Sequence, residues 1–225
     1  MSEAHACGGC GCGGHKTDAP KALSLHALSS VKHVIAIASG SGGSGKTQVC
    51  AQLANALQSD GARVGILDAD IANPSIPLFF DLPQGVTRST EGIYPALSEG
   101  GIQIISATLF LEDESELITT QGATMAGIVG QFFSDTIWSD LDYLLIDIGG
   151  GISDLSAFVL ERIPLRGMLA VHPNNARSPL PATRLHGLAQ THGTQVLADL
   201  STDLTKTPVL TSNDLTQCLD ILQTL

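Results

Sequence analysis

Short apolar runs alternate with amphipathic stretches along most of the chain. Runs of β-branched and other aliphatic residues between turn signals predict buried strands at 31–38, 63–67, 102–106, 143–148, 168–171 and 194–197. The spacing of apolar positions predicts helices at 46–58, 123–138, 154–162, 181–190 and 213–224, and a short helix at 23–30. Strands that alternate with helices form right-handed crossovers. We therefore expect an α/β fold with a mostly parallel sheet and helices on both faces.

The composition fits one domain preceded by an arm. A chain of 225 residues with 43% hydrophobic and 15% charged residues has enough apolar material for a single full core. Residues 1–20 instead combine glycine, cysteine and histidine without periodicity. We predict a flexible arm over 1–20 and one folded domain over 21–225.

The charge balance narrows the possible partners. Eleven basic and 22 acidic side chains give a formal net charge of -11, which disfavours nonspecific binding to nucleic acid or to an anionic membrane. No apolar run reaches the roughly 18 residues of a membrane helix, and the N-terminus lacks an apolar signal core. A cytoplasmic location, where thiols stay reduced, is expected.

The strongest motif is a phosphate-binding loop between the first strand and the next helix. Residues 40–47 read GSGGSGKT and match G-x-x-x-x-G-K-[ST] in full. In such a loop, backbone N–H groups surround phosphate oxygens, the lysine neutralises the β- and γ-phosphates, and the hydroxyl ligates Mg²⁺. The expected nucleotide-binding residues are Gly40, Gly42, Gly43, Ser44, Gly45, Lys46, Thr47 and Gln48.

Aspartates at strand ends supply the rest of the predicted site. Asp147 closes an apolar strand and is expected to hold Mg²⁺ together with Thr47. Asp70 is predicted to position an attacking water, with Lys46 as its catalytic companion and Asp68 in support, although one of the two aspartates could merely cap the following turn.

The expected nucleotide is ATP, because no Asn-Lys-x-Asp guanine loop occurs in the chain. Asn174 and Asn175 follow a predicted strand and could contact the base or serve as plain turn residues.

Two longer segments resemble the Mrp/MinD-type P-loop ATPases, in the branch of iron–sulfur cluster carriers. Residues 67–77 read LDADIANPSIP and are similar to the D-A-D-I-x-G-P-S-I-P segment of that branch. Residues 138–147 read WSDLDYLLID and resemble W-x-x-L-D-Y-L-[IL]-I-D. The resemblance covers about residues 31–175 and implies a MinD-like P-loop fold and a homodimer.

The chain departs from this family in three places. Ser41 stands where the family loop G-K-G-G-x-G-K-[ST] carries its additional lysine, so the resemblance puts ATP hydrolysis in question. Glycines replace the two prolines of the P-P-G-T-G-D switch, which should loosen it. The C-terminal C-P-x-C pair is missing, and Cys50 and Cys218 are expected to be buried thiols.

The N-terminal arm is the predicted metal-binding segment. Cys7, Cys10 and Cys12, spaced by glycines, can wrap one ion or cluster, with His5, His15 or a second subunit completing the ligand set. The arm partly resembles the four-cysteine site of eukaryotic-type carriers. It is closer to the C-x-x-C-G-C start of hydrogenase nickel-accessory GTPases. We expect an iron–sulfur cluster or a thiolate-bound metal, nickel or zinc; the alternative is an arm with adventitious thiols.

Together these patterns predict an ATP-binding, metallochaperone-like homodimer that helps to assemble or deliver an iron–sulfur cluster or another metal centre. Its partner would be a client metalloprotein or a maturation factor. The alternative is a non-hydrolysing regulatory or scaffold subunit that retains the fold. A chromosome- or division-site-positioning ATPase is disfavoured, because no membrane-binding tail or basic surface is visible in the sequence.

Overall fold

Seven strands form the central sheet of the computed structural model, which describes residues 21–82, 85–111, 122–174, 179–207 and 209–225. Their order is β5-β6-β2-β7-β1-β8-β9. All neighbouring pairs are parallel except β5 with β6. The bounds are β1 (Val31–Ala38), β2 (Val64–Asp68), β5 (Ala96–Leu97), β6 (Gln103–Ile105), β7 (Leu141–Asp147), β8 (Gly167–Pro173) and β9 (Val196–Thr202).

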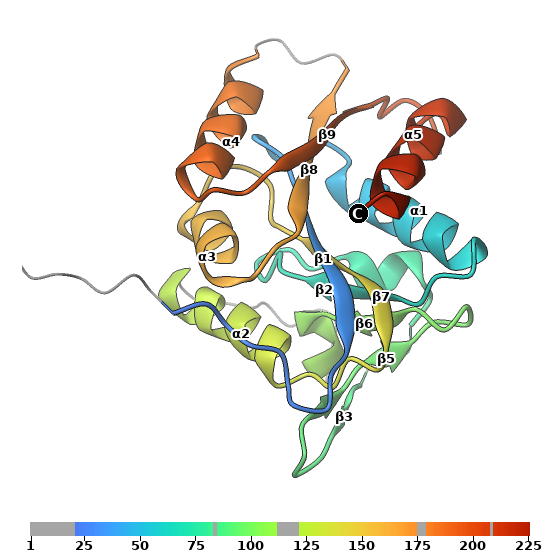
Figure 1. Cartoon of the computed structure of the whole chain (residues 1–225), viewed down its shortest axis with the longest axis vertical. Coiled ribbons are helices and arrows are strands. Elements are labelled where there is room, and N and C mark those ends of the chain that lie inside the picture. Colours follow the sequence, from blue (N-terminus) through green and yellow to red (C-terminus); the bar gives the residue numbers. More distant parts are fainter. Residues whose placement is uncertain (1–20, 83–84, 112–121, 175–178, 208) are drawn as a thin grey trace, which may run out of the picture.

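Helices cover both faces of this sheet (Figure 1). Two of them pack with one face, namely α1 (Lys46–Ser59) and α5 (Ser212–Gln223). Three pack with the other, namely α2 (Gly122–Ser134), α3 (Asp154–Arg162) and α4 (Leu180–Thr191). The predicted α/β class with helices on both faces is confirmed.

The smaller elements lie between β2 and α2 and were absent from the prediction. They are the hairpin of β3 (Thr87–Arg88) and β4 (Ile93–Tyr94), and the 3-10 helices η1 (Ile76–Phe79) and η2 (Ala107–Phe110). Each is too short to produce a hydrophobic period in the sequence.

The helix predicted at 23–30 is wrong. Residues 21–30 contain only a turn, because their polar groups bond to remote segments. The Ser29 hydroxyl donates to the Thr136 carbonyl and accepts from the Trp138 amide, and the Leu23 amide donates to the Arg162 carbonyl. These tertiary bonds replace the local bonds that a helix needs. The helix predicted at 123–138 likewise ends earlier, at Ser134, and Trp138 is buried in the core.

The central strands place two aspartates side by side. β7 lies between β1 and β2, and every residue from Tyr143 to Asp147 is buried. In the register of β2 with β7, Asp68 pairs with Asp147 at the carboxyl ends of both strands. Ligands of open parallel sheets bind beyond this edge.

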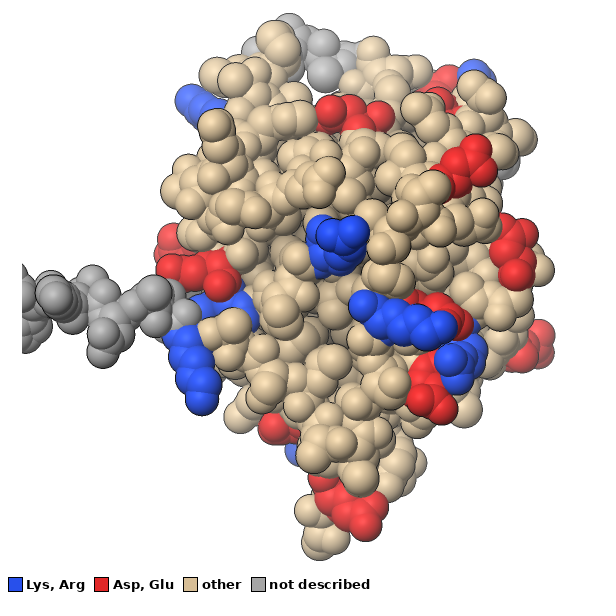
Figure 2. All heavy atoms as spheres, in the orientation of Figure 1, with Lys and Arg blue, Asp and Glu red and all other residues tan. Residues whose placement is uncertain are grey.

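The described helices include none that is long and apolar enough to cross a membrane. On the face shown in Figure 2, lysine and arginine side chains are scattered among acidic ones and form no continuous basic patch.

Candidate functional site

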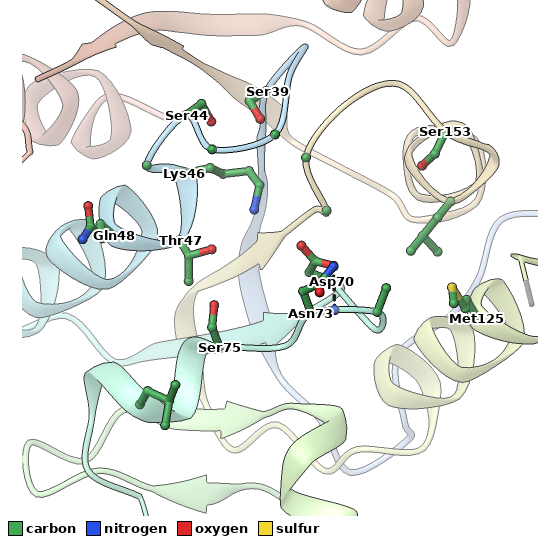
Figure 3. A pocket seen from close by; sticks show the side chains of 18 of the residues that line it. Ser39, Ser44, Lys46, Thr47, Gln48, Asp70, Asn73, Ser75, Met125 and Ser153 are labelled. Carbon is green, nitrogen blue, oxygen red and sulfur yellow. Dashed lines mark hydrogen bonds between the residues drawn. The ribbon is translucent and has the colours of Figure 1, made fainter. Parts of the chain in front are cut away.

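A cavity of about 870 Å³ opens at the carboxyl edge of the sheet, where the glycine-rich loop joins β1 to α1. Figure 3 shows Lys46 and Thr47 reaching from the start of α1 toward the loop that carries Asp70 and Asn73. Of the predicted nucleotide-binding residues, those that line the cavity are Gly42, Gly43, Ser44, Gly45, Lys46, Thr47 and Gln48. The structure thus brings seven of the eight to one surface.

Lys46 and Asp147 form a buried ion pair at the base of this cavity. Lys46 Nζ lies 2.5 Å from Asp147 Oδ1, and the two side chains are 5% and 1% exposed. Burial raises the pKa of Asp147, and the charge of Lys46 acts in the opposite direction. Lys46 lines the cavity, whereas Asp147 lies behind it and is not among the lining residues, so the pair has very little solvent around it.

The second oxygen of Asp147 has no partner within the described residues. Asp147 Oδ2 is buried and accepts no hydrogen bond. A buried carboxylate oxygen without a donor is costly, and a bound cation or its water would satisfy it. Thr47 lies close enough for its hydroxyl to lower the pKa of Asp147. These two residues therefore fit the predicted Mg²⁺ site.

Asp68 organises the segment that follows β2. Its Oδ2 accepts from the Ser75 and Ile76 amides at 3.1 and 3.2 Å and from the Ser106 hydroxyl at 2.9 Å. Its Oδ1 accepts from the Asp70 amide at 3.1 Å. Burial, together with the charge of Asp147, raises the pKa of Asp68 to about 7 despite these bonds. The structure thus gives Asp68 a scaffolding position rather than one that faces the cavity.

Asp70 faces the cavity, as the prediction for water positioning requires. It lines the pocket together with Asn73, whose backbone amide donates to Asp70 Oδ1 at 3.2 Å (Figure 3). A Cβ added to Gly149 would lie 3.3 Å from the Asp70 carboxyl carbon. The segments after β2 and after β7 therefore meet at Asp70, directly across from the phosphate loop.

Gly40 does not line the cavity. A Cβ at this position would lie 2.1 Å from the Pro181 carbonyl oxygen at the start of α4. On the other side of the loop, Thr202 of β9 donates its hydroxyl to the Ser44 carbonyl at 2.7 Å. Pro181 and Thr202 thus fix the loop from two elements, and no short motif in the sequence marks either residue.

The segment after β7 packs closely on the same loop. A Cβ at Gly150 would approach the Gly42 Cα to 2.8 Å, and the Gly151 amide donates to the Ser39 carbonyl at 3.1 Å. Glycine is therefore needed at position 150 for the close approach of two backbones. The looser switch expected from the sequence stays a prediction.

The remaining predicted residues lie elsewhere. Cys50 and Cys218 are fully buried, and burial raises the pKa of the Cys218 thiol to about 12, which confirms them as core thiols. The backbone amide of Asn174 donates a hydrogen bond to the Thr202 carbonyl, and Asn174 does not line the cavity. Asn175 lies outside the described residues, as do the arm residues Cys7, Cys10 and Cys12 with His5 and His15.

Known proteins with similar sequences include several iron–sulfur cluster carriers. The chain is 37% identical to an iron-sulfur cluster carrier protein of Clostridium perfringens, over 71% of this chain and 58% of that protein. It is 38% identical to a cytosolic Fe-S cluster assembly factor of Saccharomyces cerevisiae, over 60% of this chain and 48% of that protein. The chain spans about half the length of the curated relatives it matches.

Solved structures agree with the fold. A nucleotide-binding protein from Archaeoglobus fulgidus, in complex with ADP, has a TM-score of 0.67 and 32% identity, over 76% of this chain and 66% of that one. The MinD cell division protein of Aquifex aeolicus, at 20% identity, shares the fold alone with a TM-score of 0.54, over 85% of this chain and 78% of that one.

A family model covers most of the described domain. The ParA model described as NUBPL iron-transfer P-loop NTPase matches residues 30–200, which include the loop, both strand-end aspartates and the segment after β7. The match begins one residue before β1 and ends within β9. The chain therefore belongs to the ParA family of P-loop NTPases, in its iron-transfer group.

Proposed function

We propose that this protein is an ATP-binding, metallochaperone-like carrier that helps to assemble or deliver an iron–sulfur cluster or another metal centre. The observation that carries the nucleotide half of the proposal is the buried Lys46–Asp147 pair beneath the glycine-rich loop. The family assignment and the names of the curated relatives support the iron–sulfur half.

Four residues share three roles in the proposed nucleotide site. Lys46 neutralises the β- and γ-phosphates and leaves its contact with Asp147 in part to do so. Thr47 and Asp147 hold Mg²⁺, which would satisfy the unpartnered Oδ2 of Asp147. Bound Mg²⁺ supplies positive charge that offsets the negative charge of the phosphate oxygens. Asp70 faces the same space and positions a water.

The cargo half of the proposal rests on the N-terminal arm. Cys7, Cys10 and Cys12 offer three thiolates, which suit an iron–sulfur cluster or a nickel or zinc ion. A fourth ligand would come from His5, His15 or a second subunit. The client would be a metalloprotein or another maturation factor in the cytoplasm, the compartment named for one of the relatives.

A second candidate, a regulatory subunit that binds but does not hydrolyse ATP, is favoured by one observation. Among the described residues that line the cavity, Lys46 is the single cation. Ser41 occupies the place of the family's additional lysine, and its carbonyl accepts the Ser39 hydroxyl at 2.8 Å. Without a second cation the γ-phosphate loses a large electrostatic stabilisation during transfer. ATP hydrolysis by the chain alone is then expected to be weak at most, or to depend on a partner.

One experiment with two matched variants tests both halves. The full chain is purified and reconstituted with iron and sulfide without oxygen, and both bound iron and ATP affinity are measured. The triple variant Cys7→Ser, Cys10→Ser, Cys12→Ser should lose the cluster absorbance and keep ATP binding. Lys46→Ala should keep the cluster and lose ATP binding by at least ~100-fold, because a buried charge contact to phosphate is removed.

The two variants overturn different parts of the proposal. Unchanged iron content in the cysteine variant would remove the arm as the cargo site. Undiminished ATP binding by Lys46→Ala would refute the nucleotide site. Fast magnesium-dependent phosphate release by the parent would reject the non-hydrolysing alternative.

A further inference from the structure

Three side chains that the nucleotide site does not use converge beside β8. His172 Nε2 and His186 Nε2 each lie 2.8 Å from the same atom, Asp199 Oδ1. All three ligand atoms lie within 4.8 Å of one another. The two imidazole rings are stacked at 25° with their centroids 6.3 Å apart. Both rings thus direct a nitrogen at one point from the same side.

The fold creates this convergence from three separate elements. His172 lies near the end of β8, His186 in the middle of α4 and Asp199 in the middle of β9. In the parallel register, Asp199 of β9 pairs with Ala170 of β8, and His172 lies two residues after Ala170 on the same strand. Side chains two residues apart on a strand point to the same face, so Asp199 and His172 lie on one face of the sheet. The helix α4 is the crossover that joins these strands and packs with that face of the sheet (Figure 1). Its His186 reaches Asp199 at 2.8 Å.

We propose that His172, His186 and Asp199 form a second metal site, which takes a divalent first-row transition ion such as Zn²⁺. Two imidazole nitrogens and one carboxylate oxygen are a common donor set for such ions. The side chains are 22%, 41% and 54% exposed, so water has access to fill the remaining coordination positions. This donor set is nitrogen and oxygen, unlike the thiolates of the arm.

The geometry needs little adjustment. Donors about 2.0–2.1 Å from a tetrahedral Zn²⁺ lie roughly 3.3 Å apart, slightly farther than the present contacts. Side-chain movements on the order of 1 Å would admit the ion, and each neutral imidazole would ligate it through Nε2 with its proton on Nδ1. Without metal, the carboxylate accepts both hydrogen bonds and holds the rings in place.

The proposed metal site adjoins the phosphate loop. The His172 carbonyl accepts a hydrogen bond from Thr202, whose hydroxyl also contacts the Ser44 carbonyl. On the same helix as His186, Pro181 packs against Gly40. An ion bound here would hold β8, α4 and β9 together, and these elements support the loop.

The test uses the full chain with Cys7, Cys10 and Cys12 replaced by serine, so that thiolates cannot compete for the ion. Zn²⁺ affinity is measured against a chromogenic chelator, without nucleotide. This parent should bind one Zn²⁺ per chain. Asp199→Asn and His186→Gln should each lower the affinity by at least the ~10- to 100-fold that loss of an outer-shell partner costs. His192→Gln, at the end of the same helix, is the matched control and should leave the affinity unchanged.

A spectrum and a melting curve complete the test. Co²⁺ in the same parent should give visible d–d bands without a thiolate charge-transfer band, and Zn²⁺ should raise the melting temperature of the parent and of His192→Gln only. No Zn²⁺ binding by the parent, or an equal loss in His192→Gln, would overturn the proposal. The metal-free variants should melt like the parent. Failure here leaves the ATP and cluster measurements intact, since those use other residues.

Discussion

At the scale of single residues, the site is defined by two adjacent buried acids and a single cation that pairs with one of them. Asp68 and Asp147 end neighbouring strands and are both fully buried. Burial and the charge of Asp147 raise the pKa of Asp68. Lys46 pairs with Asp147 alone, so one negative charge is compensated within the protein. Bound Mg²⁺ would compensate the other, which gives a physical reason for a metal beside the nucleotide.

The pH dependence of stability should report this charge balance. The pKa of Asp68 is about 7 when folded and near 3.8 when unfolded, so its protonated form stabilises the fold at low pH. That contribution is lost as pH rises from about 4 to 7. Relative to Asp68→Asn, the nucleotide-free protein should therefore lose on the order of 2 kcal/mol of unfolding free energy between pH 5 and 8. Urea denaturation at several pH values measures the slope of unfolding free energy against pH for the parent and for Asp68→Asn.

The control for this prediction is an aspartate with the opposite shift. Hydrogen bonds from Lys32 and from the Arg63 amide lower the pKa of Asp142 to about 2. Asp142 is then ionised in both states above pH 5, and Asp142→Asn should leave the slope as in the parent. Parallel slopes for the parent and Asp68→Asn would show that Asp68 is ionised throughout.

At the scale of elements, the sequence predicts what repeats within one helix or strand. Continuous apolar runs predicted the central strands, and α3 begins at its predicted residue because Ser153 and Ser156 form a capping box. The helix predicted at 23–30 failed because Ser29 and Leu23 bond to distant segments. Local periodicity cannot show such bonds. Local periodicity also could not show that the start of α4 packs against the phosphate loop.

The contact of α4 with the loop can be tested by adding one methyl group. Gly40→Ala places a Cβ 2.1 Å from the Pro181 carbonyl oxygen, so the loop or α4 must move. We expect a loss of about 1–3 kcal/mol in unfolding free energy and weaker ATP binding. Thermal melts and nucleotide titrations measure both.

A glycine on α4 itself serves as the comparison. A Cβ at Gly187 has nothing within 4 Å, and the residue lies inside the helix, so Gly187→Ala should stabilise by about 0.5–1 kcal/mol and leave ATP binding unchanged. If Gly40→Ala behaved like Gly187→Ala, the close packing of the loop against α4 would be disproved.

At the scale of the whole molecule, the phosphate loop and its strand-end aspartates could be predicted because each occupies a short segment. The cluster of His172, His186 and Asp199 could not, because 14 and 13 residues separate its members along the chain. Only the parallel register of β8 with β9 and the placement of α4 bring them together. A site formed by one loop can be predicted from a sequence motif, whereas a site formed by residues from several elements requires the structure.

The proposed homodimer is a question at this same scale, and apolar residues at the cavity mouth argue for it. Leu78 and Phe79 line the cavity yet are 70% and 42% exposed, as expected of a surface that a second copy covers. Leu78→Asp would lose about 1.5–3 kcal/mol of burial, which weakens an ATP-bound dimer by roughly 10- to 100-fold. Leu97 is 62% exposed on β5 and lies away from the cavity, so Leu97→Asp should leave the dimer unchanged. Analytical ultracentrifugation with ATP and Mg²⁺ measures the dimer affinity of each variant. A monomeric parent, or equal weakening by the two variants, would argue against a dimer across the nucleotide face.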